Sequence, residues 1–255
     1  MDPVVTSEYS FYLVAISFAL AFIGSLMALM VTRRIRLKNG DVNRAAAITA
    51  GVALGGIGVW SMHFVGMAAL KLNVASSYGL VETALSLIAV IVSTSTALII
   101  VSKAPDNILR ILGGGLLLGL GVVVMHYLGM YGMKTAGYIL WDANMIAVSV
   151  LIAVVAATAA LWLAFNTSNF ASRIAASVLM AGAVSAMHYT GMGAAEFICT
   201  TPNRFETVQG WGLVSSLGLG SLVAAAACGM AMVISLDLYM QWVQRATAAP
   251  RSKAA

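Results

Sequence analysis

The chain has 255 residues, of which 61% are hydrophobic and only 9% are charged. Because soluble proteins carry about 25% charged residues, this composition excludes an ordinary water-soluble globular domain. The formal charge of +5 comes from Lys and Arg residues that stand between long apolar runs. We therefore attribute it to membrane orientation and not to nucleic-acid binding.

A helix that spans a bilayer needs roughly 20 mostly apolar residues. The windows that meet this requirement are 10–32, 45–70, 80–102, 108–133, 143–165, 171–197 and 212–240. The sequence thus predicts an all-α polytopic membrane protein with seven transmembrane helices. We expect an outer N-terminal segment at 1–9, a seven-helix domain at 10–240 and a tail at 241–255. The first apolar run is longer than a signal-peptide core, so we expect an uncleaved anchor.

The orientation follows from the basic residues in the short connections, because basic loops stay on the cytoplasmic side. Connections on one side carry eleven Lys and Arg residues, and those on the other side carry three. This predicts a membrane protein with its N-terminus outside and its C-terminus in the cytoplasm. Aromatic residues such as Trp141 and Trp211 begin odd-numbered spans at the predicted outer interface, which agrees with this orientation.

One six-residue motif occurs three times. It reads MHFVGM at Met62–Met67, MHYLGM at Met125–Met130 and MHYTGM at Met187–Met192. These motifs contain the three histidines of the chain, spaced 63 and 62 residues apart, about the length of one helical hairpin. The sequence therefore predicts three helix-hairpin repeats followed by a seventh helix.

The histidines are predicted to lie at one depth in the membrane. The first charge after each histidine comes eight residues later, and these charges are Lys71, Lys134 and Glu196. At 1.5 Å per residue each imidazole lies roughly 12 Å below that charge, well inside the apolar layer. All three motif helices run in the same direction, so we expect the three imidazoles to form a ring.

The spacing within the motif predicts a shared ligand set. Residues four apart lie on one face of a helix, so each histidine shares a face with the methionine that ends its motif. The candidate metal ligands are His63, Met67, His126, Met130, His188 and Met192. The methionines directly before the histidines face neighbouring helices. We expect them to be additional ligands or to form the wall of the metal site: Met62, Met125 and Met187. The motif glycines leave room for close helix approach: Gly66, Gly129 and Gly191.

Imidazole and thioether groups in an apolar, carboxylate-free setting suit copper, particularly Cu(I), better than magnesium, calcium or manganese. Zinc accepts three histidines but gains little from methionine. Haem is the distant second guest, because three equivalent helices fit a compact ion better than a planar macrocycle. The competing interpretation is structural, with histidines that bond across helix interfaces. The threefold repetition favours function, since ionisable groups inside a membrane are costly.

The three motifs and their spacing resemble the MHYT domain family of bacterial integral membrane sensors over about residues 10–240, with Phe64 where tyrosine is usual. The resemblance implies a seven-helix domain of the bacterial inner membrane that binds copper through Met and His near the outer face. It would sense oxygen, carbon monoxide, nitric oxide or a change of redox state. In many relatives a diguanylate cyclase, phosphodiesterase or kinase module follows. Because the sequence ends soon after the last span, we expect either an isolated sensor that signals to a separate cytoplasmic protein or a fragment.

Other functions have weaker support. No nucleophile with a base, no carboxylate pair and no phosphate-binding loop occurs, so no enzyme is predicted. A retinal protein needs a mid-helix lysine, and a proton transporter usually carries acids within its spans; neither is found. The main alternative is a membrane protein that delivers or exports copper, although a carrier should have ligands that step across the membrane. We expect Cys228 to pack in the core and Cys199 to lie just beyond the sixth span.

Overall fold

The computed structural model describes residues 5, 7–37, 39–200, 205–206 and 208–248. Within them, seven helices are long and apolar enough to cross a membrane, as the sequence predicted. The second span is one continuous helix made of three elements. The spans are α1 (Phe11–Thr32), α2–η1–α3 (Arg44–Gly51, Val52–Ser61 and Met62–Ala69), α4 (Leu80–Ser102), α5 (Ile108–Tyr131), α6 (Ala143–Asn166), α7 (Phe170–Gly193) and α8 (Ser216–Ala248).

Polar side chains cap the helices where the apolar runs begin. Asn107, Asp142 and Asn169 each accept hydrogen bonds from backbone N–H groups in the first turns of α5, α6 and α7. These caps satisfy donors that have no partner within the helix, which matters most where water is scarce. The predicted starts of these three spans therefore agree with the structure to within one residue.

The predicted ends of the spans differ at one end of the bundle, where short strands replace helix. The pairs are β1 (Ser7–Tyr9) with β2 (Leu70–Leu72), β3 (Ser76–Gly79) with β4 (Met133–Thr135), and β5 (Gly137–Trp141) with β6 (Ala195–Cys199), while β7 (Leu213–Ser215) also pairs with β3. Antiparallel pairing between these strands satisfies the backbone N–H and C=O groups of residues beyond the helix ends. The prediction of helix to residue 197 and from residue 212 was therefore wrong.

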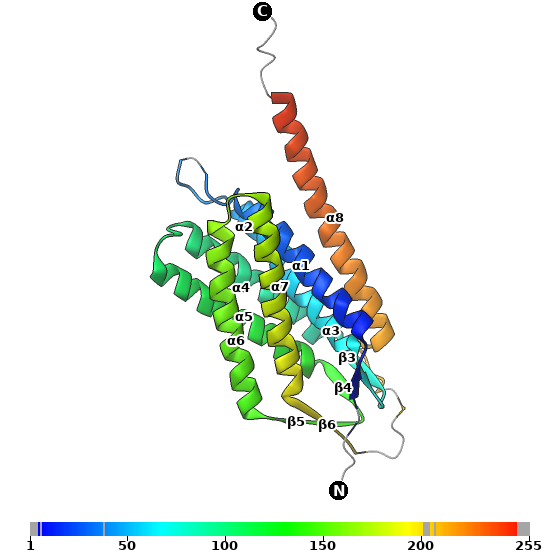
Figure 1. The fold of residues 1–255 in the computed structure, drawn as a ribbon. Coiled ribbons are helices and arrows are strands. Elements are labelled where there is room, and N and C mark those ends of the chain that lie inside the picture. Colours follow the sequence, from blue (N-terminus) through cyan, green and yellow to red (C-terminus); the bar gives the residue numbers. More distant parts are fainter. Residues whose placement is uncertain (1–4, 6, 38, 201–204, 207, 249–255) are drawn as a thin grey trace, which may run out of the picture.

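The first six spans close into a ring. Neighbours in the ring are α1 with η1, α2 with α4, α4 with α5, α5 with α6, α6 with α7, and α7 with α1. Helix α8 lies outside this ring, along η1 and α3, and extends beyond the predicted end at residue 240 (Figure 1). The second span is therefore covered on two sides and is the most buried of the seven.

The second span contains a long π-helical segment, η1, directly before the first histidine motif. In this wider helix the Ser61 hydroxyl donates a hydrogen bond to the carbonyl of Gly56, five residues earlier. A Cβ on Gly24 of α1 would overlap the backbone of Gly58, so the two helices cross with their backbones almost touching. The sequence predicted a regular α-helix here; π-helical segments are rare and often adjoin functional sites.

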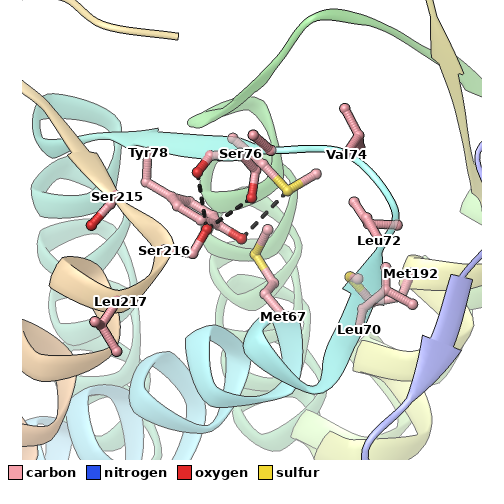
Figure 2. Close-up of a pocket in the computed structure, with 12 residues that line it drawn as sticks. Met67, Leu70, Leu72, Val74, Ser76, Tyr78, Met192, Ser215, Ser216 and Leu217 are labelled. Carbon is pink, nitrogen blue, oxygen red and sulfur yellow. Dashed lines mark hydrogen bonds between the residues drawn. The ribbon is translucent and has the colours of Figure 1, made fainter. Parts of the chain in front are cut away.

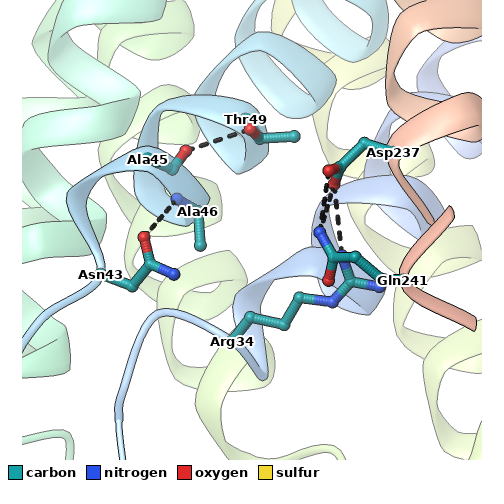
Figure 3. A network of polar contacts seen from close by, with 7 residues as sticks. All are labelled: Arg34, Asn43, Ala45, Ala46, Thr49, Asp237 and Gln241. Carbon is teal, nitrogen blue, oxygen red and sulfur yellow. Dashed lines mark hydrogen bonds and ion pairs between the residues drawn. The ribbon is translucent and has the colours of Figure 1, made fainter. Parts of the chain in front are cut away.

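At the end of the bundle opposite the strands, a polar network joins α8 to the turn after α1 (Figure 3). Arg34 donates to the carboxylate of Asp237 at 3.3 Å, and the Gln241 side chain donates to the same carboxylate at 2.8 Å. Nearby, Asn43 caps α2 by accepting the N–H of Ala46. The last turns of α8 are thus tied to the first hairpin.

Candidate metal centre

The three histidines meet inside the ring. His63 of α3, His126 of α5 and His188 of α7 are each at most 1% exposed. Their Nδ1 atoms form a nearly equilateral triangle, with sides of 3.1 Å (His63–His126), 3.2 Å (His63–His188) and 3.3 Å (His126–His188). The predicted convergence of the three imidazoles is therefore present, and the same nitrogen of each ring points toward the centre.

The triangle of nitrogens cannot be satisfied by hydrogen bonds alone. A neutral imidazole nitrogen carries either one proton or one lone pair. With one proton among the three, at least one side joins two lone pairs; with two, the protons crowd against each other. Three lone pairs directed at one cation remove this conflict.

The size of the triangle fits a metal ion. The point equidistant from the three Nδ1 atoms lies about 1.8 Å from each, the mean side of 3.2 Å divided by √3. This is slightly shorter than the Zn–N bond length of about 2.0–2.1 Å, so a small outward shift of the rings would accommodate an ion. The His63, His126 and His188 cluster therefore has the geometry to bind a metal ion.

Each imidazole occupies the space left by the motif glycine of another repeat. A Cβ built on any of these glycines would overlap the Nε2 atom of the facing ring. The pairs are His63 with Gly129, His126 with Gly191, and His188 with Gly66. The rings cross at interplanar angles of 73°, 85° and 89°. Among the described residues, none of the three Nε2 atoms has a hydrogen-bond partner.

The motif methionines are all buried, and they lie on two sides of the histidines. Met67 and Met192 line a cavity of about 330 Å³ at the strand end of the bundle (Figure 2), and Met130 lines a second cavity there. Met187, before the third histidine, lines an apolar cavity toward the opposite end. Met62 packs against Ala21 and Ala181 of neighbouring helices. From the spacing, we expect the methionine that ends each motif to share a helix face with its histidine, and the one before each histidine to be an additional ligand or to line the site.

The aromatic residue after each histidine packs edge-on against that imidazole. The ring centroids are 4.7 Å apart for Phe64 and 4.8 Å apart for Tyr127 and Tyr189. Each of the three also meets an aromatic side chain of a strand that precedes an odd-numbered span. These contacts are Phe64 with Tyr78, Tyr127 with Trp141, and Tyr189 with Tyr9.

The seventh residue of α1, α4 and α6 is in each case a buried serine: Ser17, Ser86 and Ser149. Two of these serines form a hydrogen bond with the tyrosine that follows a motif histidine. The hydroxyl of Tyr189 lies 2.9 Å from that of Ser17, and the hydroxyl of Tyr127 lies 2.7 Å from that of Ser149. These bonds hold the motif helices against the odd-numbered helices beside them.

In the first repeat a different residue forms the hydrogen bond to the helix serine. Phe64 has no hydroxyl to reach Ser86. The indole N–H of Trp60, one turn earlier, donates instead to the Ser86 hydroxyl at 3.1 Å and lies 3.1 Å from the carbonyl of Thr83. Trp60 also packs edge-on against Phe64, so the departure from tyrosine is compensated within one helical turn.

Comparison with known proteins identifies the family to which this repeat belongs. A family model, MHYT, described as "Bacterial signalling protein N terminal repeat", matches residues 56–114 and 119–177. Each matched stretch contains one of the first two histidine motifs. The chain belongs to the MHYT domain family. No solved structure matches the chain.

The relatives of this MHYT domain are signalling proteins. The bifunctional diguanylate cyclase/cyclic di-GMP phosphodiesterase MucR of Pseudomonas aeruginosa is 36% identical over 239 residues, 90% of this chain and 34% of MucR. The cyclic di-GMP phosphodiesterase NbdA of the same organism is 31% identical over 233 residues, 87% of this chain and 29% of NbdA. Signaling protein YkoW of Bacillus subtilis is 29% identical over 196 residues, 74% and 24% of the two chains. The chain therefore spans about a third or less of these relatives.

The MHYT motif led sequence reasoning to the histidines but not to the groups that hold them. The strand aromatics and the helix serines stand eight residues apart in all three repeats: Tyr9 and Ser17, Tyr78 and Ser86, Trp141 and Ser149. This recurrence is visible once the three repeats are aligned on their odd-numbered spans. Its meaning emerges only from the contacts to Phe64, Tyr127 and Tyr189.

The two cysteines are separate from the histidine triad of the MHYT domain. Cys228 is exposed on α8, so the prediction of core packing was wrong. The reason is that α8 lies outside the ring and packs with only one face, leaving the rest of its apolar surface for lipid. Cys199 is buried at the end of β6, just beyond the sixth span as expected.

Proposed function

We propose that this MHYT domain is a membrane sensor whose signal-responsive centre is copper, bound by the Nδ1 atoms of His63, His126 and His188. The observation that carries this proposal is the buried triangle of nitrogens with sides of 3.1–3.3 Å. A structural triad would have to bury an unfavourable contact between lone pairs or protons, which costs free energy in a low-dielectric interior. A bound cation makes the same arrangement favourable.

Copper is favoured by the donors and their surroundings. The three imidazoles are neutral ligands, and buried methionines stand one turn further along the same helices: Met67, Met130 and Met192. Cu(I) accepts three-coordinate nitrogen and sulfur ligation, whereas zinc gains little from thioether. Haem is less compatible, because rings this close together leave no flat slot for a macrocycle.

The signal in this proposal is a diatomic gas (oxygen, carbon monoxide or nitric oxide) or a change of redox state. Copper supplies a centre that changes oxidation state and binds such gases. Because trigonal and tetragonal coordination demand different donor positions, the three imidazoles would have to shift or rotate when the preference changes. They belong to three different spans, so their movement repositions α3, α5 and α7 together.

Helix α8 is the element suited to carry this movement out of the membrane. It packs along η1 and α3, the segments that precede and contain His63, and its far end is tied to the first hairpin through Asp237 and Arg34 (Figure 3). In this proposal the strand end faces outward and α8 leads into the cytoplasm, as the basic loops suggest. The names of MucR and NbdA suggest cyclic di-GMP turnover as the output, on the same polypeptide or on a separate protein.

The test is elemental analysis of the purified protein. Wild type is compared with the single variants H63A, H126A and H188A and with the triple variant, after loading with Cu(I) under reducing conditions. After weakly held ions are removed with a competing chelator, we expect one tightly bound copper ion per chain in wild type, sharply less in each single variant and none in the triple variant. C228S is the matched control and should retain copper, because this thiol is exposed on α8. Zinc in place of copper, or equal metal in all proteins, would contradict the proposal.

Transport of copper is the alternative function that the same donors would serve. A carrier requires a second set of ligands toward the cytoplasmic side, and the histidine triad lies at one level. Uptake of copper into sealed vesicles that contain the protein distinguishes the two. A sensor binds a fixed number of ions per chain, whereas a carrier accumulates copper inside the vesicle.

A further inference from the structure

The cavity of about 330 Å³ at the strand end has an unusual lining (Figure 2). Three of its side chains are methionines, Met67, Met133 and Met192, and the others are aliphatic residues, serines and Tyr78. Among the residues that the structure describes, none that lines the cavity carries a formal charge. The space is therefore suited to a guest that needs soft, neutral donors and no counter-charge.

Met133 is the residue here that the repeated motif does not explain. It stands seven residues after His126, and the corresponding positions in the other repeats hold Leu70 and Ala195. Its side chain is buried, and its sulfur accepts a hydrogen bond from the Tyr78 hydroxyl at 3.4 Å. The contact holds the Met133 side chain against the cavity wall.

The same cavity adjoins the histidine triad. Met67 and Met192 follow His63 and His188 by four residues, one helical turn of about 6 Å, and the Nδ1 atoms of these two histidines are 3.2 Å apart. Two of the cavity's methionines therefore stand one helical turn beyond the triad, on α3 and α7.

We propose that this cavity is an intake site for a soft monovalent cation, Cu(I) or its analogue Ag(I), held by the thioethers of Met67, Met133 and Met192 and passed from there to the histidines. The transfer is a ligand exchange in which thioether donors are replaced by imidazole nitrogens, with no change of oxidation state. Neutral sulfur donors favour a monovalent soft ion over the divalent hard ions. This inference rests on the proposed function, because it assigns the route to that metal centre.

The first test measures the rate of metal uptake by the full chain in detergent, with Ag(I) supplied from a weak competing ligand. Met133→Leu keeps the volume and burial but removes the sulfur. We expect uptake to slow about tenfold or more, while the final occupancy of the histidine site is unchanged. Met232→Leu is the matched control, because this exposed methionine on α8 is far along the chain from the cavity. It should load at the wild-type rate.

The second test needs no variant of the cavity. Peroxide oxidation of methionines is followed by mass spectrometry with and without Ag(I), in wild type and in H126A. We expect Ag(I) to protect Met67, Met133 and Met192 in both proteins, because the cavity ligands do not depend on the triad. Loss of histidine-bound metal in H126A tests the proposed function separately. Equal uptake rates for M133L and wild type, together with no protection of Met133, would overturn the intake site whatever the triad binds.

Discussion

The Nε2 atom of His126 lies where a side chain on Gly191 would have to go. The two residues come from different repeats, and the same relation joins His63 to Gly129 and His188 to Gly66. Each of the three imidazoles thus packs against a glycine of another motif helix. The geometry of the triad therefore depends on the close packing of all three repeats.

The first prediction concerns the contact between Gly191 and His126. Gly191→Ala should push the His126 ring out of position and reduce metal affinity by about 10- to 100-fold, the usual effect of disturbing groups that orient a ligand. Titration with Cu(I) against a competing chelator measures the affinity. Gly182→Ala on the same helix is the control, because no atom lies within 4 Å of the Cβ it would add. Equal affinities for the two variants would show that the glycine does not position the imidazole.

The second prediction concerns the bond between Tyr127 and Ser149. Tyr127→Phe and Ser149→Ala should each lower the free energy of unfolding by about 0.6 kcal/mol, and by no more than about 1.7 kcal/mol, the range for interhelical hydrogen bonds in membranes. Because both remove one interaction, the double variant should lose less than the sum. Denaturant unfolding in detergent checks this. Tyr12→Phe, at a hydroxyl on an exposed side chain, should have no effect; strict additivity would argue against the bond.

The third prediction concerns the first repeat, where Phe64 replaces the tyrosine and Trp60 bonds to Ser86 instead. Trp60→Phe removes both indole hydrogen bonds, to Ser86 and to Thr83, and should lower the free energy of unfolding by about 1–3 kcal/mol. Adding Phe64→Tyr restores the hydroxyl found in the other two repeats and should recover part of that loss. In the wild-type background Phe64→Tyr should not stabilise, because Ser86 is already engaged. The same unfolding assay decides, and failure of the rescue would mean that the repeats are not equivalent at this position.

The fourth prediction concerns the ion pair at the end of the bundle opposite the strands (Figure 3). Arg34 and Asp237 have side chains that are 19% and 47% exposed, so their coupling should be at most about 1 kcal/mol. A double-mutant cycle with Arg34→Gln and Asp237→Asn measures it, and high salt should reduce it. Spin labels on α8 and α2 should nevertheless report a wider distance distribution in Asp237→Asn. An unchanged distribution would mean that the packing of α8 on η1 alone fixes the helix.

Much of this protein was accessible from the amino-acid sequence. Seven apolar windows predicted the spans, because backbone groups in lipid must be satisfied within a helix and this leaves little choice of structure. The threefold motif predicted that His63, His126 and His188 lie at one depth, since equal helix direction and equal spacing to the next charge set the level. Both results follow from local periodicity and from the thickness of the membrane.

Only the tertiary structure determined the contacts between helices, because the periodicity of a sequence does not specify them. The choice of Nδ1 as the inward atom, the seating of each ring on a glycine of another repeat, and the substitution of Trp60 for a tyrosine hydroxyl all depend on how helices rotate against each other. The strands depend on pairing between segments as far apart as Ser77 and Ser215. A sequence specifies which residues share a helix face, but contacts between helices are set by the packing of all the spans at once.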